Sequence, residues 1–251
     1  MTFDLHGQAL EVSHDGRPFD EDDVKAISDV LKGTKRGVAG TIGKFGIGFK
    51  SVYAFTATPE IHSGTEHFRI KRYIRPEKAR RRPRKRGQAT TFVFPFDHPE
   101  LSPEDAFDLI RDGLRRLEIR TLLFLSNLTR IRWSVDAVGM GSQTCQTEDL
   151  GDCRRVTVRA SEGGKKSQED WLVFRDSGKP ASYDRGTLPV QIAYRLQRRR
   201  TPQTDRIVPS PNSRLSVFFP TDRRTDMGFL IQGSGGDGQE DAWAMARGSD
   251  T

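Results

Sequence analysis

The stretch Gly43-Lys44-Phe45-Gly46-Ile47-Gly48-Phe49-Lys50-Ser51 is the part of the chain from which the fold is best predicted. Its three glycines have G-x-x-G-x-G spacing, and the apolar residues that follow at near-helical spacing predict a loop running directly into a buried helix. Glycines let the backbone approach an anion closely, and the unpaired N–H groups and positive dipole end of a helix attract it. The stretch therefore predicts a phosphate cradle in which Lys44 and Lys50 add positive charge. A plain glycine-rich loop, with Lys50 solvated on the helix, is the alternative.

Two better-known phosphate motifs do not fit this stretch. From Gly43 to Gly48 the spacing is that of a P-loop, but Phe49 stands before Lys50 and Ser51. A P-loop also follows a buried apolar strand, whereas residues 33–41 are polar. The dinucleotide fingerprint G-x-G-x-x-G runs in the opposite order and needs a strand before it as well. A P-loop and a Rossmann fingerprint are therefore both excluded.

The composition is that of a polar chain with room for one large or two modest domains. Of its 251 residues 34% are hydrophobic and 30% charged. No apolar run approaches the roughly 18 residues that cross a bilayer, and residues 1–10 lack the layout of a signal peptide, so we expect a cytoplasmic protein with no membrane partner. Cys145 and Cys153 lack C-x-x-C spacing and there are no clustered histidines, so no metal site is predicted. A loop disulfide between the two cysteines stays open.

The formal net charge of +7 is concentrated in residues 69–86, and the rest of the chain is slightly acidic. Against Glu77 alone, this basic loop contains Arg69, Lys71, Arg72, Arg75, Lys78, Arg80, Arg81, Arg82, Arg84, Lys85 and Arg86. Such clusters gain affinity for phosphate backbones by counterion release. Nucleic acid or an acidic protein is thus an alternative partner, above all at Arg80, Arg81, Arg82, Arg84, Lys85 and Arg86. Tyr73 is the one aromatic ring in the run, which disfavours base stacking and leaves a solvated loop as the simpler interpretation.

Hydrophobic periodicity and capping residues predict the order of the elements. Asp20 and Ser102 each begin an amphipathic helix, and Gly33 is expected to end the first one. Residues 136–168 are rich in Gly, Ser, Thr and charge, and this composition predicts a boundary or long connection. Strands are predicted near residues 3–5, 10–12, 59–63, 66–73, 90–94, 131–133, 171–174, 190–196 and 215–219. The predicted domains are residues 1–135, 136–233 and a disordered tail, 234–251.

Together, His14-Asp15-Gly16-Arg17-Pro18-Phe19, the helix after it and the glycines from Gly43 to Gly48 resemble the GHKL, or Bergerat-fold, ATPase superfamily. With Pro59-Glu60-Ile61-His62-Ser63-Gly64, the glycine stretch looks most like the sacsin-type ATP-binding domain of that superfamily. The resemblance runs over about residues 5–233. It implies an α+β fold, a sandwich with helices on one face of a mixed sheet, followed by a smaller, incomplete, strand-rich second domain. It also implies ATP as the ligand, held between helices and a glycine lid.

The resemblance assigns roles to particular residues. Asp15 and Gly16 match the segment whose aspartate accepts a hydrogen bond from the adenine amino group. The usual pattern is D-x-G-x-G, and the departure from it leaves open whether His14, Asp15 or a water meets the base. Thr90 or Thr91 matches a threonine near the adenine, with an ordinary strand threonine as the alternative. The residues matched to the phosphates are Gly43, Lys44, Gly46, Gly48 and Lys50.

Two features of that superfamily are missing from the 251 residues. Its ATPases carry an E-x-x-x-N helix that supplies a general base and a magnesium ligand. Only Asn127 and Asn212 occur here, and neither has a glutamate four residues earlier. After residue 233 a Gly-, Ser- and Asp-rich sequence stands where an arginine-bearing loop is expected. We therefore expect a copy truncated at both ends that binds ATP with little or no hydrolysis and for which magnesium is doubtful. A part in a larger multidomain or chaperone-like assembly is a further possibility.

Overall fold

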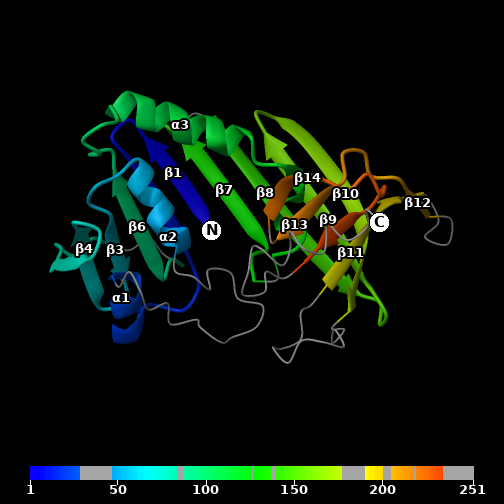
Figure 1. Ribbon diagram of the computed structural model, residues 1–251, viewed down its shortest axis with the longest axis horizontal. Helices are drawn as coiled ribbons and strands as arrows, with labels where there is room; N and C mark the ends of the chain where they lie inside the picture. The colour runs from blue at the N-terminus through cyan, green and yellow to red at the C-terminus, as the bar shows by residue number, and fades with distance from the viewer. Residues whose placement is uncertain are drawn as a thin grey trace, which may run out of the picture. The chain divides into compact units, whose positions relative to one another are not determined.

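The computed structural model describes residues 1–28, 47–83, 87–125, 127–136, 139–176, 190–199, 205–217 and 219–233 (Figure 1). The helices are α1 (Glu21–Ser28), α2 (Ile47–Lys50) and α3 (Pro103–Arg115), with 3₁₀ turns η1 (Ser51–Ala54) and η2 (Ile119–Leu122). The first strands are β1 (Thr2–His6), β2 (Ala9–His14), β3 (Glu60–Ser63), β4 (Glu66–Lys71), β5 (Arg75–Lys78), β6 (Thr90–Pro95) and β7 (Arg130–Val135). The later strands are β8 (Gly139–Asp149), β9 (Arg154–Glu162), β10 (Lys165–Asp176), β11 (Val190–Gln197), β12 (Arg206–Val208), β13 (Arg214–Val217), β14 (Phe219–Arg224) and β15 (Leu230–Gln232).

The predicted fold class, an α+β sandwich of helices on one face of a mixed sheet, is wrong. The described residues form one 15-stranded sheet in the order β14-β13-β15-β11-β10-β9-β8-β7-β1-β2-β6-β3-β4-β5, with β12 beside β11. The sheet is mixed, because β1–β7 and β13–β15 pair in parallel. Within the residues that the structure describes, helices contribute the 8 residues of α1, the 4 of α2 and the 13 of α3. Strand therefore dominates the fold.

The main error lies in residues 136–168, which were predicted to be a connection. This segment contains β8, β9 and the start of β10, and these strands are 11, 9 and 12 residues long. Their polar side chains are mostly exposed or half-buried, while Val156 and Val158 turn inward from β9. Thr, Gln and Arg on a solvated strand face look like loop composition, so the composition hid the alternation.

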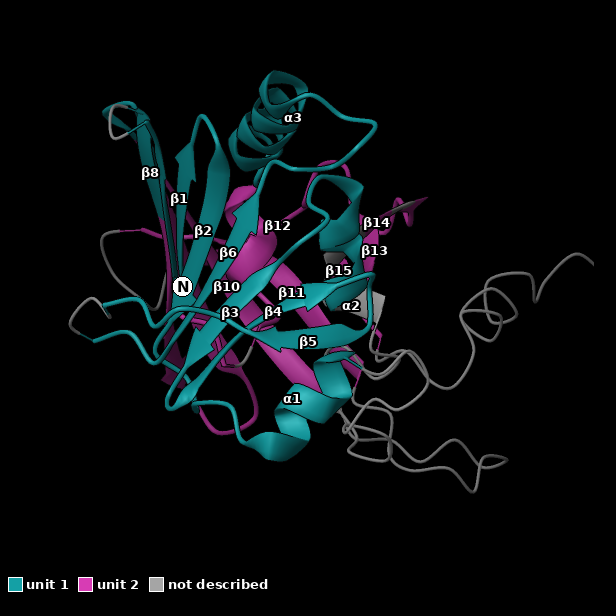
Figure 2. Ribbon diagram, turned by 90° about the vertical axis from the view of Figure 1, so that its left-hand side faces the viewer, with its two compact units in different colours: residues 1–117, 130–142, 161–165 teal, residues 118–129, 143–160, 166–251 magenta. Residues whose placement is uncertain are grey.

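The chain divides into two compact units, of which the first contains residues 1–117, 130–142 and 161–165 (Figure 2). In this unit β2, β6, β3, β4 and β5 pair antiparallel in that order. Ile61, Phe68 and Ile70 form a buried cluster on β3 and β4, and side chains from α1 and α2 pack against it. Those partly buried side chains are Val24 and Ile27 of α1 and Phe49 of α2, together with Phe19, which precedes α1, and Phe92 of β6.

Both predicted helix starts are confirmed. The Asp20 carboxylate accepts the backbone N–H of Asp23 at 2.9 Å, and the Asp23 carboxylate accepts that of Asp20 at 3.1 Å. Ser102 Oγ accepts the N–H of Asp105 at 3.1 Å, and Pro103 occupies the first helical position. These side chains satisfy N–H groups that a helix start leaves without a partner. The predicted end at Gly33 lies outside the described residues.

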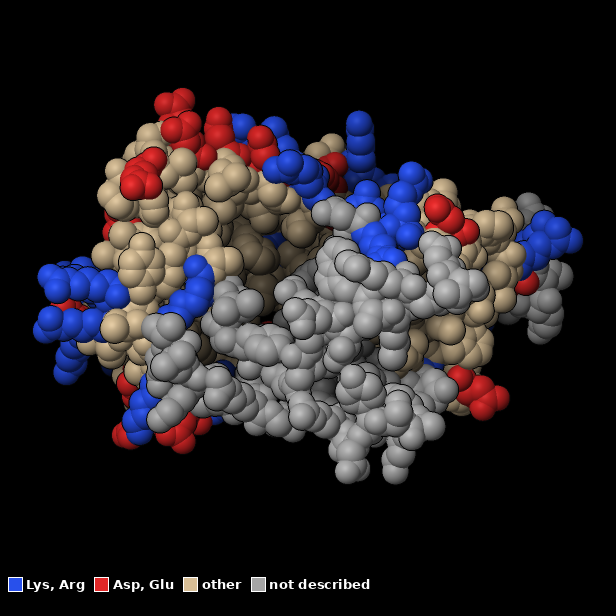
Figure 3. Space-filling model, viewed as in Figure 1, with Lys and Arg blue, Asp and Glu red and all other residues tan. Residues whose placement is uncertain are grey.

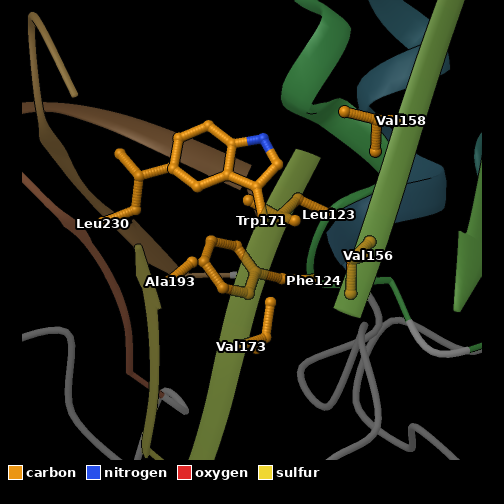
Figure 4. Close-up of a cluster of buried hydrophobic side chains, with 8 residues drawn as sticks. All are labelled: Leu123, Phe124, Val156, Val158, Trp171, Val173, Ala193 and Leu230. Atoms are coloured by element: carbon orange, nitrogen blue, oxygen red, sulfur yellow. The ribbon is translucent and has the colours of Figure 1, made fainter. Parts of the chain in front are cut away.

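The second unit contains residues 118–129, 143–160 and 166–251, and has its own core. Its buried side chains are Leu123, Phe124, Val156, Val158, Trp171, Val173, Ala193 and Leu230 (Figure 4). Trp171 is fully buried, and the Arg120 guanidinium lies over its ring at 5.1 Å. Arg120 also donates to Glu169 at 2.9 and 3.3 Å, so its charge is compensated. The predicted boundary at residue 135 and the predicted tail at 234–251 stay predictions, the tail lying outside the described residues.

Two further sequence expectations concern covalent links and membranes. Cys145 and Cys153 are both free thiols, so they form no disulfide. None of the described helices has the length and apolar character that a bilayer crossing requires.

Candidate functional site

A row of polar side chains crosses three neighbouring strands of the first unit where β2 ends. His14 of β2 pairs with Thr90 of β6, and Thr90 pairs with Ser63 of β3. Directly paired residues of antiparallel strands point to the same face of a sheet. Phe92, two residues after Thr90, is on that face too, and its ring contacts Phe19 at 5.9 Å. The polar row therefore lies on the side of the sheet where α1 and α2 pack.

Ser63 and Thr90 form the buried centre of this row. Both side chains have no exposed surface, and their hydroxyl oxygens are hydrogen-bonded to each other. Ser63 Oγ also accepts the backbone N–H of Phe19 at 2.8 Å, which attaches the segment after β2 to the sheet. Thr91 points to the opposite face, where it pairs with His62. Of the two predicted threonines, Thr90 is the one that shares a face with His14.

Asp15 and Gly16 follow β2 directly and are exposed. The Gly16 N–H donates to His14 Nδ1 at 3.1 Å, so Nδ1 is the accepting nitrogen and the neutral ring carries its proton on Nε2. Burial lowers the His14 pKa below its ordinary value, which favours this neutral form. The Asp15 carboxylate makes no hydrogen bond within the described residues, and as an ionised group it is purely an acceptor. The neutral donor, Nε2–H of His14, and the charged acceptor, the Asp15 carboxylate, thus belong to adjacent residues.

The turn that presents Asp15 is held from two sides. Arg17 bridges the carboxylates of Asp20 and Asp23 at 2.5 and 2.6 Å, at the start of α1. Pro18 lies against Gly64, where an added Cβ would come within 3.2 Å of the proline Cβ. Gly64 has φ +55°, in the left-handed region that favours glycine. The contacts of Arg17 and Pro18, together with the Phe19–Ser63 hydrogen bond, fix the backbone on which Asp15 sits.

The predicted phosphate residues are only partly within the described chain. Gly43, Lys44 and Gly46 lie outside it, and Gly48 belongs to the single turn of α2. Lys50 Nζ donates to the carbonyl of Tyr73 at 2.9 Å and to that of Ile27 at 3.4 Å. It therefore ties α2 to the end of α1 and to the β4–β5 turn. A phosphate contact by Lys50 stays a prediction.

The basic run predicted to be a loop is divided between strands and their flanks. β5 occupies residues 75–78 and was not predicted. Arg69 pairs with Glu60, Lys71 with Glu77 and Arg82 with Glu11, at 2.9, 2.8 and 2.9 Å. Arg80 and Arg81 are exposed, and residues 84–86, with Arg84, Lys85 and Arg86, lie outside the described chain.

Sequence reasoning missed a histidine pair on the sheet face opposite Thr90. His62 is 1% exposed, and its Nδ1 lies 3.2 Å from Nδ1 of His67. Its Nε2 lies 3.5 Å from the Glu60 carboxylate. Burial lowers the His62 pKa. The alternation of Glu60 and His62 along one strand was the available signal, because residues two apart in a strand share a face.

Similarity to known proteins is concentrated in the N-terminal part that carries this site. A family model described as the Sacsin domain matches residues 2–74. Protein NO VEIN of Arabidopsis thaliana is 42% identical over 70 residues, which cover 28% of this chain and 3% of that protein. Sacsin of Homo sapiens is 47% identical over 62 residues, which cover 25% of this chain and 1% of that protein. The chain thus spans a very small part of these relatives, and its residues 2–74 are similar to the Sacsin domain.

Proposed function

We propose that the chain binds ATP, with the adenine at the end of β2 and the phosphates toward the glycine segment before α2. The observation that carries the proposal is the position of Asp15. Asp15 is an exposed carboxylate directly after β2, adjacent in sequence to His14, which pairs with Thr90 beside the buried Ser63–Thr90 hydrogen bond. The Sacsin-domain match at residues 2–74 contains both Asp15 and the glycine segment, which supports assigning them to one site.

The donor and acceptor at the end of β2 suit an adenine edge. Adenine presents an amino donor next to a ring-nitrogen acceptor, whereas guanine carries a carbonyl oxygen at the position of that amino group. The Asp15 carboxylate accepts from the amino group, and the Nε2–H of neutral His14 is a donor for the ring nitrogen. Phe19, Phe49 and Phe92 supply apolar surface on the same side of the sheet. The residues present therefore fit an adenine base.

The other predicted site residues take supporting roles. Thr90, through its hydrogen bond to Ser63, holds the Phe19 backbone and so the turn that presents Asp15. Thr91, on the opposite face, is not assigned to the base. The phosphate contacts are assigned to the backbone around Gly43, Gly46 and Gly48, with Lys44 and Lys50 as nearby cations.

Hydrolysis by these 251 residues alone is expected to stay near background. A general base commonly contributes about 10²–10⁴-fold in rate, and a magnesium ligand stabilises the charge that develops on the phosphates. The sequence contains no glutamate and asparagine at E-x-x-x-N spacing. Magnesium is therefore expected to affect ATP binding little. Magnesium-dependent turnover by the purified chain would refute this part of the proposal.

Isothermal titration with ATP, with and without magnesium, tests the binding site. A lost hydrogen bond to a charged group typically costs about 1.5–3 kcal/mol, so Asp15→Ala should weaken ATP binding by at least about tenfold. Gly46→Ala should weaken it as well. Asp22→Ala is the matched control, because Asp22 is an exposed carboxylate of α1 that forms an exposed ion pair with Lys25 at 3.6 Å. Equal ATP affinities of the Asp15 and Asp22 variants, or equal affinities of the native chain for ATP and GTP, would contradict the adenine assignment.

A further inference from the structure

The basic residues at the edge of the first unit fall into two electrostatic classes. Eight of the basic residues between 69 and 82 are described. Half of them form ion pairs with Glu11, Glu60 or Glu77, namely Arg69, Lys71, Arg75 and Arg82. Within the described residues the other half have no carboxylate partner and are exposed, namely Arg72, Lys78, Arg80 and Arg81. Four positive charges are thus left uncompensated on one hairpin. Figure 3 shows basic side chains gathered over the β4–β5 hairpin, at the left-hand edge of the view.

The uncompensated charges follow a single edge strand. β5 ends the order of the sheet, and Arg72 lies in the tight turn before it. Lys78 ends β5, and Arg80 and Arg81 follow. Extended chain rises about 3.3 Å per residue, so the nine residue steps from Arg72 to Arg81 span at most roughly 30 Å. A linear polyanion has charges at intervals along such a length.

A rigid aromatic side chain stands at one end of this track. Arg72 and Tyr73 have φ of 52° and 69°, both in the left-handed region, and the Ile74 N–H closes the turn by donating to the Lys71 carbonyl at 3.3 Å. Tyr73 is 58% exposed, and its ring contacts the ring of Tyr53 with the centroids 4.7 Å apart and the planes tilted by 58°. The Tyr73 carbonyl also accepts from Lys50 Nζ, which fixes the turn. The exposed ring is therefore held in place, so little conformational entropy is lost when a flat group stacks on it.

Backbone pairing with an added peptide strand does not suit this edge. The Ala79 N–H donates to the His67 carbonyl, and the register gives Glu77 and Arg75 the same orientation, with their backbone N–H and C=O groups directed toward β4. The residues of β5 whose backbone groups are directed away from β4 are therefore Pro76 and Lys78. Proline has no N–H, and proline and lysine are residues that block strand addition at sheet edges. Recognition at this edge rests on charge and on the Tyr73 ring.

We propose that the β4–β5 hairpin binds single-stranded nucleic acid, with phosphates along Arg72, Lys78, Arg80 and Arg81 and a base stacked on Tyr73. Stacking separates this ligand from other polyanions, since an acidic peptide or an anionic lipid surface offers no base for the ring. The site lies on the edge strand β5, whereas the proposed adenine site lies at the end of the interior strand β2, and Lys50, which donates to the Tyr73 carbonyl, is the one residue named for both. Arg84, Lys85 and Arg86 take no part in the assignment.

Fluorescence anisotropy of the full chain with a labelled oligothymidylate of 12 nucleotides, across a salt series and without ATP, tests this inference. Four phosphate contacts on a single strand predict a slope of log K against log salt of about −2.8. Replacing the four cations together by glutamine should remove most of that slope. The matched control replaces Arg115, Arg130, Lys165 and Lys166 by glutamine, since these exposed cations have no carboxylate partner within the described residues. This control removes the same net charge elsewhere and should leave most of the affinity.

Tyr73→Leu separates stacking from charge, because it keeps an apolar side chain and changes no ion pair. Stacking on an aromatic ring contributes about 1–3 kcal/mol per base, so oligonucleotide binding should weaken about 5- to 160-fold with an unchanged salt slope. Circular dichroism establishes that each variant is folded. Equal losses in the two charge variants would overturn the proposal. So would full affinity of Tyr73→Leu, or stronger binding to phosphatidylserine vesicles or polyglutamate than to the oligonucleotide.

Discussion

Replacing Gly141 by alanine should destabilise the first unit strongly. A Cβ built on Gly141 in β8 would lie 2.0 Å from Cζ2 and 2.1 Å from Cε2 of Trp133 in β7. Carbon atoms in contact are about 3.5–4.0 Å apart, so the indole ring would have to move by roughly 1.5 Å. Trp133 is only 5% exposed and its ring is inflexible, so the displacement reaches its neighbours. Overpacking of this kind costs about 1–3 kcal/mol, and the close approach places Gly141 near the top of that range.

Gly139→Ala is the control, because it lies on the same strand and its added Cβ would have only an ordinary contact, 3.5 Å from the Cβ of Val135. Alanine in place of a strand glycine otherwise gains about 0.5–1 kcal/mol. We therefore expect Gly141→Ala to be less stable than Gly139→Ala by about 3 kcal/mol. Urea unfolding followed by circular dichroism and tryptophan fluorescence measures the difference. Stabilities within about 0.5 kcal/mol of each other would refute the close packing of Trp133 on Gly141, as would a failure of Trp133→Leu to recover stability in the Gly141→Ala background.

Two further perturbations test the first unit. Ser63→Ala leaves the Phe19 N–H and the Thr90 hydroxyl without their partner, so it should lower the free energy of unfolding by about 1–3 kcal/mol. Thr65→Ala, at an exposed position, is the control and should change that free energy little. Equal effects of the two variants in a urea titration would contradict the buried hydrogen bonds. Burial holds the pKa of His62 below its ordinary value, so the His62 imidazole binds a proton more readily in the unfolded chain than in the folded chain. The free energy of unfolding should therefore fall as the pH drops below about 6.5 toward the lower pKa of the folded state. His62→Gln should flatten that part of the pH profile, and an unchanged slope would exclude His62 as its source.

Helix starts and apolar strands were predicted correctly from the sequence, because they depend on residues close to one another in the chain. Asp20 and Ser102 begin helices because their side chains satisfy backbone N–H groups within three residues, a requirement that needs no tertiary information. The apolar strands of residues 59–63 and 90–94 were also predicted, since their buried faces are continuous. The Asp15–Gly16 turn was found through its resemblance to a known motif.

The rest depends on pairing between distant segments. Polar strands such as β8 are stable because neighbouring strands satisfy their backbone groups, and composition does not report this. The fold class was therefore wrong even though many individual strands were right. Ser63 was not assigned a role from the sequence, because its importance comes from hydrogen bonds to Phe19 and Thr90, which are 44 and 27 residues away. Lys50 likewise acquires its backbone partners only when α2 lies beside the β4–β5 turn.

The two faces of β2, β6 and β3 are linked by the register of these strands. On one face the register aligns His14, Thr90 and Ser63 below the turn that presents Asp15. On the other face the same register brings Glu60 within reach of Arg69 and Arg82, with His62 buried beside them. A slip of one residue would turn Glu60 toward the apolar side, where its charge would have no partner. The ion pairs on one face thus help to select the only register in which the polar row on the other face is assembled, so the geometry at Asp15 depends on charged residues that no ligand at Asp15 would touch.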